Sequence, residues 1–141
     1  MAASEADVVP EDFEFLTRDA GFSVLLREKG TSFDDACVIL SSGNLLLRFS
    51  RSKGDLFIEA SSQPGAGTWL DLDLVRVLVA HGDPGVFAPF NELAVFLRRH
   101  LSTVKVLFSQ DNIGSTIERL EQLGRERIRK LFPGDGHIKD T

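Results

Sequence analysis

Between Ala36 and Ser62, apolar and polar residues alternate with a period of two, which is the spacing of side chains along a half-buried β-strand. Two short turns interrupt the alternation, one at residues 42–44 (SGN) and one at residues 52–55 (SKGD). Glycine and asparagine at these places can adopt the positive φ angles that a tight hairpin needs. The pattern therefore predicts an antiparallel meander of three short strands, around which the rest of the chain is arranged.

The same alternation predicts what the two faces of this sheet carry. Leu45 and Leu47 fall on one face, whereas Leu46 falls on the other. In the next strand, Ile58 and Phe57 alternate in the same way, with Phe57 on the second face. Because Leu46 and Phe57 are apolar, we expect the second face to be only partly polar and to be open to a partner protein.

The segments before the meander predict one helix and one further strand. Pro10 suits the first position of a helix, and acidic residues follow it where they favour the positive end of the helix dipole. We expect this helix to run for about three turns to a C-cap at Gly21, and residues 22–28 to form a strand. Residues 1–9 are small and acidic, and we predict that they are disordered.

Residues 61–68 (SSQPGAGT) form the clearest loop, and the segment after it has two interpretations. Asp71 can cap a helix that extends to about Ala80. Alternatively, leucines alternate with Trp69, Asp71 and Asp73, which favours a fifth strand. The pattern leaves open whether residues 68–73 are a strand or the start of a helix.

Apolar residues at spacings of three and four predict two long helices at the end of the chain. The first begins at Pro89 and continues to about Phe108, and the second continues from Ser109 to Leu131. Residues 134–141 are a polar tail that we expect to be disordered. The apolar face of the second helix comprises Ile113, Ile117, Leu120, Ile128 and Leu131.

Together these elements predict a single α+β domain over residues 10–133. It has an N-terminal helix, a four-stranded antiparallel meander sheet and three C-terminal helices that cover one face of the sheet. The sheet gains a fifth strand if residues 68–73 pair with it. Its other face and its edges remain available to a partner.

Composition narrows the class of protein. The chain has 141 residues, 43% of them hydrophobic, and one cysteine, which is typical of a globular domain that folds without disulfides. Its start has neither a basic segment nor an apolar run, and no stretch reaches roughly 18 apolar residues, so we predict a cytoplasmic protein that does not enter a membrane. A net charge of −5 disfavours nucleic-acid binding, and we interpret the basic clusters at residues 98–100 and 125–130 as solvent-exposed helix faces.

No pattern of residues points to catalysis, a cofactor or a metal ion. Cys37 lies within an apolar run and has no basic neighbour, as a buried strand cysteine would. His81, His100 and His137 each lack a second ligand at the spacing that zinc sites use. The glycine-rich loop at residues 61–68 lacks the Lys-Ser/Thr ending of a phosphate-binding loop.

Several residues remain as candidate contacts for a partner protein. Asp34 and Asp35 form one carboxylate pair and Asp73 belongs to another, and both pairs flank the sheet, where a basic partner could use them. Trp69 follows the flexible loop and suits either a core anchor or an interaction hot spot. The predicted contact residues are Asp34, Asp35, Leu46, Phe57, Trp69 and Asp73.

The order of these segments resembles a known group of proteins. The strings DFEFL, AGF, ILSSGNLLLRFSRSKGDLFIEAS, WLDLDLV and RIRKLFP follow one another as in small bacterial single-domain proteins of unknown function. The similarity extends from Phe13 to Pro133. Some proteins of this layout are immunity proteins, which bind and neutralise a cognate toxin. The resemblance implies an α+β fold and a protein partner, and it assigns no binding role to a particular residue.

We therefore expect a non-enzymatic domain that binds a protein partner, with an immunity-like protein as one form of it. The alternative is a small ligand-binding protein or enzyme with a pocket between the sheet and the helices. A third hypothesis is a homodimer built on the open sheet face or on an edge strand.

Overall fold

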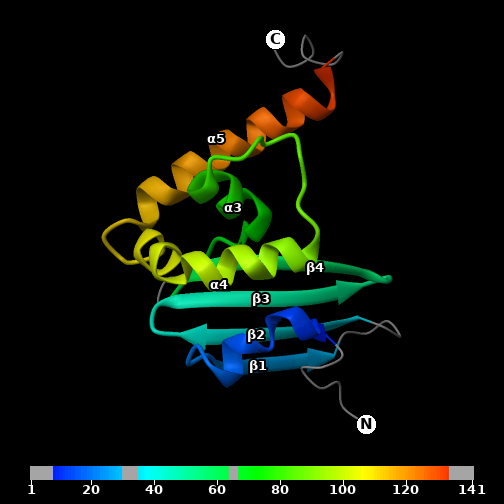
Figure 1. The fold of residues 1–141 in the computed structure, drawn as a ribbon, viewed down its shortest axis with the longest axis vertical. Coiled ribbons are helices and arrows are strands. Elements are labelled where there is room, and N and C mark those ends of the chain that lie inside the picture. The colour runs from blue at the N-terminus through cyan, green and yellow to red at the C-terminus, as the bar shows by residue number, and fades with distance from the viewer. Residues whose placement is uncertain (1–7, 30–34, 64–66, 134–141) are drawn as a thin grey trace.

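The computed structural model describes residues 8–29, 35–63 and 67–133, and it shows an α+β fold with an antiparallel sheet in the middle of the chain (Figure 1). Two short helical turns precede the sheet, and three helices follow it. The predicted α+β class is thus confirmed. In chain order the elements are η1 (Glu11–Phe13), α2 (Phe15–Arg18), β1 (Ser23–Lys29), β2 (Ala36–Ser42), β3 (Leu45–Ser52), β4 (Asp55–Ser62), β5 (Leu70–Asp71), α3 (Leu72–Ala80), α4 (Phe90–Leu107) and α5 (Ile113–Leu131).

The sheet has five strands in the order β1-β2-β3-β4-β5, each antiparallel to its neighbours. The β3–β4 hairpin turns through Lys53 and Gly54, whose φ angles of 53° and 85° match the two positive angles of a type I′ turn. In the β2–β3 turn, Gly43 has a φ of 59°. The expectation that Asn44 also adopts a positive φ is wrong, and its side chain instead donates to the Phe108 carbonyl oxygen at 3.0 Å.

Both interpretations of the segment after the glycine-rich loop hold in part. Leu70 and Asp71 form the two-residue strand β5, which pairs with β4, and α3 begins at Leu72. Asp71 is the N-cap that the sequence predicts, because its Oδ1 accepts a hydrogen bond from the Asp73 amide at 2.9 Å. The capping residue therefore both ends the strand and starts the helix.

The N-terminal segment differs from the single helix predicted for residues 10–21. Two short turns, η1 and α2, replace it, and neither has a side chain that caps its first amide groups. Helices this short are not stable alone, so their geometry follows from packing, and Phe13 and Leu16 are fully buried. Val8 and Val9, which the sequence places in a disordered end, are also buried in the core.

The core lies between one face of the sheet and the helices. Val38 and Phe49 point to this face and are buried, and the Phe49 ring meets the Phe13 ring edge-on at 5.3 Å between centroids. In Figure 1, α4 crosses the sheet, and its Lys105 donates to the Ser42 hydroxyl at 2.8 Å. One continuous cluster of buried side chains includes residues from η1, the sheet, α3, α4 and α5.

The last helix, α5, forms an outer layer that packs chiefly against α3 (Figure 1). Its buried residues are Thr116, Leu120 and Arg127. The prediction that Ile128 and Leu131 face the core is wrong, since they are 61% and 43% exposed. The reason is length: α3 has 9 residues and α5 has 19, so the shorter helix cannot cover the last turns of the longer one. Neither α5 nor any other helix of the described residues is both long and apolar enough to span a membrane.

Candidate functional site

Near its start, β4 is paired on one side only. Its eight residues pair with β3 from end to end, whereas β5 pairs only with Glu59 and Ala60. The backbone groups of an antiparallel strand point alternately to its two neighbours, and the closing pair of a two-residue hairpin is bonded across the turn. The backbone groups of Leu56 and Ile58 therefore point away from β3, and in the part of the chain that the structure describes no strand pairs with them. We call residues 55–58 the free edge of β4.

A groove of about 380 Å3, which we call the β4 groove, runs along this edge. Phe57 of β4, Phe87 of the loop before α4 and Phe90 at the start of α4 line it, with 51%, 55% and 40% of their surface exposed. Burying one such ring lowers the free energy by about 1.5–3 kcal/mol, so three exposed rings around one groove mark a surface suited to contact. The lining residues are Leu56, Phe57, Ile58, Glu59, Asp71, Asp73, Phe87, Ala88, Phe90 and Leu93.

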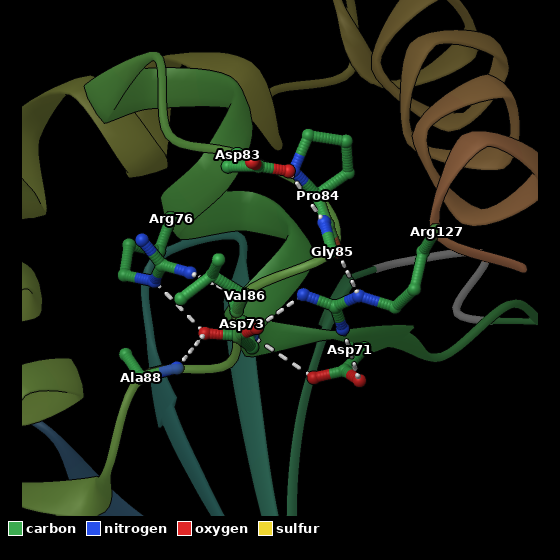
Figure 2. Close-up of polar contacts among 9 residues, drawn as sticks. All are labelled: Asp71, Asp73, Arg76, Asp83, Pro84, Gly85, Val86, Ala88 and Arg127. Atoms are coloured by element: carbon green, nitrogen blue, oxygen red, sulfur yellow. Dashed lines mark hydrogen bonds and ion pairs between the residues drawn. The ribbon is translucent and has the colours of Figure 1, made fainter. Parts of the chain in front are cut away.

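A buried arginine holds the loop that forms one wall of the groove. Arg127 of α5 has 6% of its surface exposed, and its side chain reaches from α5 to the start of α3 (Figure 2). Its guanidinium donates to the Asp73 carboxylate and, at 2.6 Å, to the Pro84 carbonyl oxygen. The same group lies 4.0 Å from the centroid of the Phe87 ring. Arg127 of α5 thus forms hydrogen bonds with both α3 and the loop.

Asp73 is the acceptor at the centre of this network. Besides the bond from Arg127, its carboxylate accepts from Arg76 Nε at 2.8 Å and from the Ala88 amide at 3.1 Å. Arg76 in turn donates to the Val86 carbonyl oxygen at 2.9 Å. Burial alone would raise the pKa of the Asp73 carboxyl, but the hydrogen bonds from the two arginines and the Ala88 amide outweigh burial and lower this pKa. The loop is therefore attached to charged side chains of both α3 and α5.

The outer end of the loop is attached to α5 as well. Lys130 Nζ lies 3.0 Å from Asp83 Oδ1, which also accepts from the Gly85 amide at 2.8 Å. The Gly85 amide and then the Lys130 ammonium lower the pKa of the Asp83 carboxyl. A Cβ at Gly85 would lie 3.1 Å from Lys130 Cβ, so glycine allows the loop to pass this close to α5.

Two carboxylates meet where the groove reaches β5. Asp71 and Glu59 are cross-strand partners, and both line the groove. The Asp71 side chain is 51% exposed, and its Oδ2 lies 3.7 Å from Arg127 Nη1. Burial raises the pKa of the Asp71 carboxyl by more than the Asp73 amide and the Arg127 guanidinium lower it, and the carboxylates of Asp73 and Glu59 add smaller increases. Like charges at directly opposite strand positions repel each other, so this end of the groove favours a cation.

Trp69 supports this end of the groove indirectly. Arg48 donates to Glu59 Oε1 at 2.7 and 3.0 Å, and its guanidinium lies 4.2 Å from the centroid of the Trp69 ring. Trp69 is partly buried and is not among the residues that line the groove. Trp69 therefore contacts the groove only through Arg48, whose guanidinium positions the Glu59 carboxylate.

Of the predicted contact residues, the structure places Phe57 and Asp73 in the groove. Asp73 is nevertheless 5% exposed and bonded to arginines, so it is a structural acceptor and its predicted exposure to a partner is wrong. The same prediction is wrong for Leu46, which is also 5% exposed. Ser61, the cross-strand partner of Leu46, donates to the Thr68 carbonyl oxygen at 2.6 Å, so Thr68 lies beside this part of the face.

The remaining predicted carboxylate pair does not contribute to the groove. Asp34 lies outside the described residues. Asp35 stands immediately before β2 and is not among the lining residues. Its Oδ1 is buried and has no hydrogen-bond partner among the described residues.

Three residues of the groove or its wall are not among the contact residues that the sequence predicts: Phe87, Phe90 and Arg127. The pattern assigns Arg127 to a solvent-exposed basic cluster, which is wrong because the loop before α4 folds against α5 and covers the guanidinium. Phe90 shares the helical spacing of the apolar residues of α4, yet its ring is 40% exposed. The sequence does contain a signal for these two phenylalanines. Both lie in residues 86–90 (VFAPF), which follow the turn residues Pro84 and Gly85, and few core positions occur in such a segment.

Other chemistry is sparse in the described residues. Cys37 is partly buried, which raises the pKa of its thiol, and the Ser50 hydroxyl lies 3.9 Å from its sulfur. Within residues 8–29, 35–63 and 67–133, no three His, Cys, Asp or Glu side chains are placed to hold a metal ion. Comparison of the chain with protein-family models, with curated proteins and with solved structures found no match.

Proposed function

We propose that this chain is a non-enzymatic domain that binds a partner protein at the β4 groove. The observation that carries the proposal is the group of exposed phenylalanines, Phe57, Phe87 and Phe90, beside a free strand edge. Aromatic residues in fixed positions contribute much of the energy of protein interfaces. A strand edge without a paired strand is also the part of a sheet that another chain pairs with most readily.

The surroundings of the groove support binding because they hold it in one shape. Arg76 and Arg127 donate to carbonyl oxygens on either side of the loop turn, those of Val86 and Pro84. The Phe87 ring rests on the Arg127 guanidinium, yet 55% of its surface remains exposed. A site that is already ordered loses less conformational entropy when a partner binds.

A partner with a basic surface fits the charge of the chain. The net charge is −5, and Glu59 and Asp71 contribute carboxylates to the groove. Complementary charge raises the rate of association and selects among partners. An immunity-like protein that neutralises a toxin is the specific form of this proposal. It predicts that the chain protects cells from the product of a neighbouring toxin-like gene, and a chain that gives no protection would contradict this form.

Binding of a small ligand is the second candidate function, and one cavity favours it. A hollow of about 470 Å3 lies between the N-terminal turns and the first two strands. Glu14 and Arg18 provide charged groups on one side of it, and Phe22 and Val24 line the other. In an NMR screen of small-molecule fragments, shift changes centred on Phe22 and Val24 would support this function.

The proposed function is tested by affinity capture from the source cells with the double variant Phe57→Ser/Phe87→Ser. The wild-type chain is expected to recover a protein that the double variant binds about 100-fold more weakly, because the variant lacks two aromatic anchors. Val106→Ser is the matched control, since Val106 is 58% exposed and does not line the groove. The recovered partner is then purified and titrated against each chain to measure its affinity. Equal recovery by all three chains would contradict the proposal.

A further inference from the structure

The free edge of β4 has a geometry that selects a particular kind of partner segment. On the basis of the proposed function, we propose that the β4 groove takes an extended segment of a partner protein, which pairs antiparallel with residues 55–58 and carries lysine or arginine between two apolar residues. The segment becomes an edge strand of the sheet and continues the line of β5.

The edge is left unfilled because the chain of β5 turns away from it. Asp71 caps α3 and the helix begins at Leu72, so β5 ends after two residues. The outward-pointing backbone groups of Leu56 and Ile58 are in line with those of Ala60, one of the two residues that pair with β5. Four strand positions span about 13 Å, which is enough for a short added strand.

The alternation of side chains along β4 determines what the segment carries. Leu56 and Ile58 point to the core side of the sheet. Phe90 and Leu93 also line the groove, so the residues of the segment opposite Leu56 and Ile58 are apolar. Phe57 points to the other side, and a cationic side chain opposite it can lie against the exposed ring.

Charge at the end of the groove also favours a cation at this central position. The residue opposite Phe57 lies on the same face as Asp71 and two positions along the strand from it, a separation of about 7 Å that lysine and arginine can bridge. Asp71 is half-exposed and faces Glu59 across the strand pair. Arg48 forms an ion pair with Glu59, and Arg127 forms a longer one with Asp71 at 3.7 Å. Because the Asp71 side chain remains 51% exposed, its carboxylate can also accept a cation from the partner.

A second copy of the chain would occupy the edge in a different way. Two copies can pair their β4 edges antiparallel about a two-fold axis and close into a dimer, whereas pairing β1, the other edge strand, with β4 of the next copy joins two different edges and propagates from copy to copy. Sedimentation that shows concentration-dependent assembly, together with protection of the Leu56 and Ile58 amides in the absence of peptide, would overturn the proposal.

Synthetic peptides test the pairing directly. The probe is the end-blocked heptapeptide Thr-Thr-Val-Lys-Val-Thr-Thr, which places valine, lysine and valine opposite residues 56–58. In antiparallel pairing the two valine amides point to β4 and the lysine amide points away. N-methylation of both valines should therefore abolish binding, whereas N-methylation of the lysine is the matched control and should leave binding nearly unchanged. A peptide with glutamate in place of lysine tests the charge.

The expected results are specific to this arrangement. We expect the lysine peptide to bind at least about tenfold more tightly than the glutamate peptide, and to slow hydrogen exchange at the Leu56 and Ile58 amides. Asp71→Asn retains a capping side chain and removes the charge, so the preference for lysine should fall about threefold or more. Glu118→Gln removes an exposed carboxylate on α5 and should not change this preference.

Three results would overturn the inference: equal binding of the valine-methylated peptide, equal binding of the lysine and glutamate peptides, or no binding at millimolar peptide. These results are separable from failure of the proposed function. If the captured partner is lost from Phe57→Ser/Phe87→Ser but protects neither Leu56 nor Ile58 amides, only the strand pairing is wrong. If the partner binds the double variant normally, the proposed function itself fails.

Discussion

Arg127 lies at the point where α5, the start of α3 and the loop before α4 meet. Replacement by methionine, Arg127→Met, leaves the buried Asp73 carboxylate with Arg76 as its remaining ion-pair partner. We expect the free energy of unfolding to fall by about 3 kcal/mol, because removing one partner of a buried ion pair leaves charge without compensation. Urea denaturation followed by circular dichroism measures the change.

Arg125→Met is the matched control for this prediction. Arg125 is exposed on the same helix, and its replacement should change the free energy of unfolding by less than about 0.5 kcal/mol. Equal effects of the two variants would mean that the network around Asp73 does not contribute to stability.

Asp73 and Asp71 should act in opposite directions on the pH dependence of stability. The pKa of the folded Asp73 carboxyl is lowered, so its stabilising contribution is present above the unfolded pKa, about 3.9, and is lost as the pH falls through the folded pKa. The pKa of the folded Asp71 carboxyl is raised, so its ionised form destabilises the fold, and this destabilisation is relieved as the pH falls through the folded pKa. Asp73→Asn should therefore reduce the acid-induced loss of unfolding free energy below about pH 4, and Asp71→Asn should enlarge the loss.

Urea denaturation at a series of pH values between about 3 and 6 measures these slopes. Asp111→Asn, at an exposed position before α5, is the control and should leave the slope as in the wild type. A slope that is the same in Asp73→Asn and the wild type would contradict the role of Asp73 as a charged acceptor.

Among the elements, Gly54 of the β3–β4 turn and Gly124 of α5 should respond oppositely to replacement by alanine. Gly54 has a φ of 85° and open space around it, so Gly54→Ala should lower the free energy of unfolding by about 1–2 kcal/mol through backbone strain alone. Gly124 lies within α5, and an added Cβ would meet Leu74 Cδ1 at an ordinary 3.7 Å. Gly124→Ala should raise the free energy of unfolding by about 0.5–1 kcal/mol. Thermal and urea unfolding of both variants check the signs, and a loss in Gly124→Ala would indicate strain in α5.

The elements differ in how far they can be predicted from the sequence. The β3–β4 hairpin is predictable because its turn residues and its alternation of side chains agree within a few positions. The start of the chain is not, since Phe13, Phe15 and Leu16 are all buried and follow no single periodicity. Their conformation depends on contacts with the sheet, such as that between Phe13 and Phe49. The end of α5 is mispredicted for a related reason, because only the position of α3 shows which of its turns are covered.

For the whole molecule, the acidic surface predicts a dependence of binding on salt. We expect the affinity for the lysine peptide to fall about threefold or more between 50 and 500 mM salt, because screening weakens its attraction to Asp71 and Glu59. The glutamate peptide should not weaken in the same way. Fluorescence of Trp69, the one tryptophan of the chain, can report the titration, since its ring contacts Arg48 and Arg48 contacts Glu59. Affinity for lysine that does not change with salt would contradict a role for these carboxylates.

The sequence by itself determined what depends on near neighbours: the alternation of the strands, the glycine of the β3–β4 turn and the capping role of Asp71. Tertiary structure decided which of these residues reach the surface. Leu46 and Phe57 occupy the same face and look alike in the pattern, but Leu46 is 5% exposed in the folded chain and Phe57 is 51% exposed. Likewise, Phe87 and Arg127 meet only because the loop folds against α5. Spacing along a chain specifies the direction of a side chain, whereas its burial depends on distant segments that cover it.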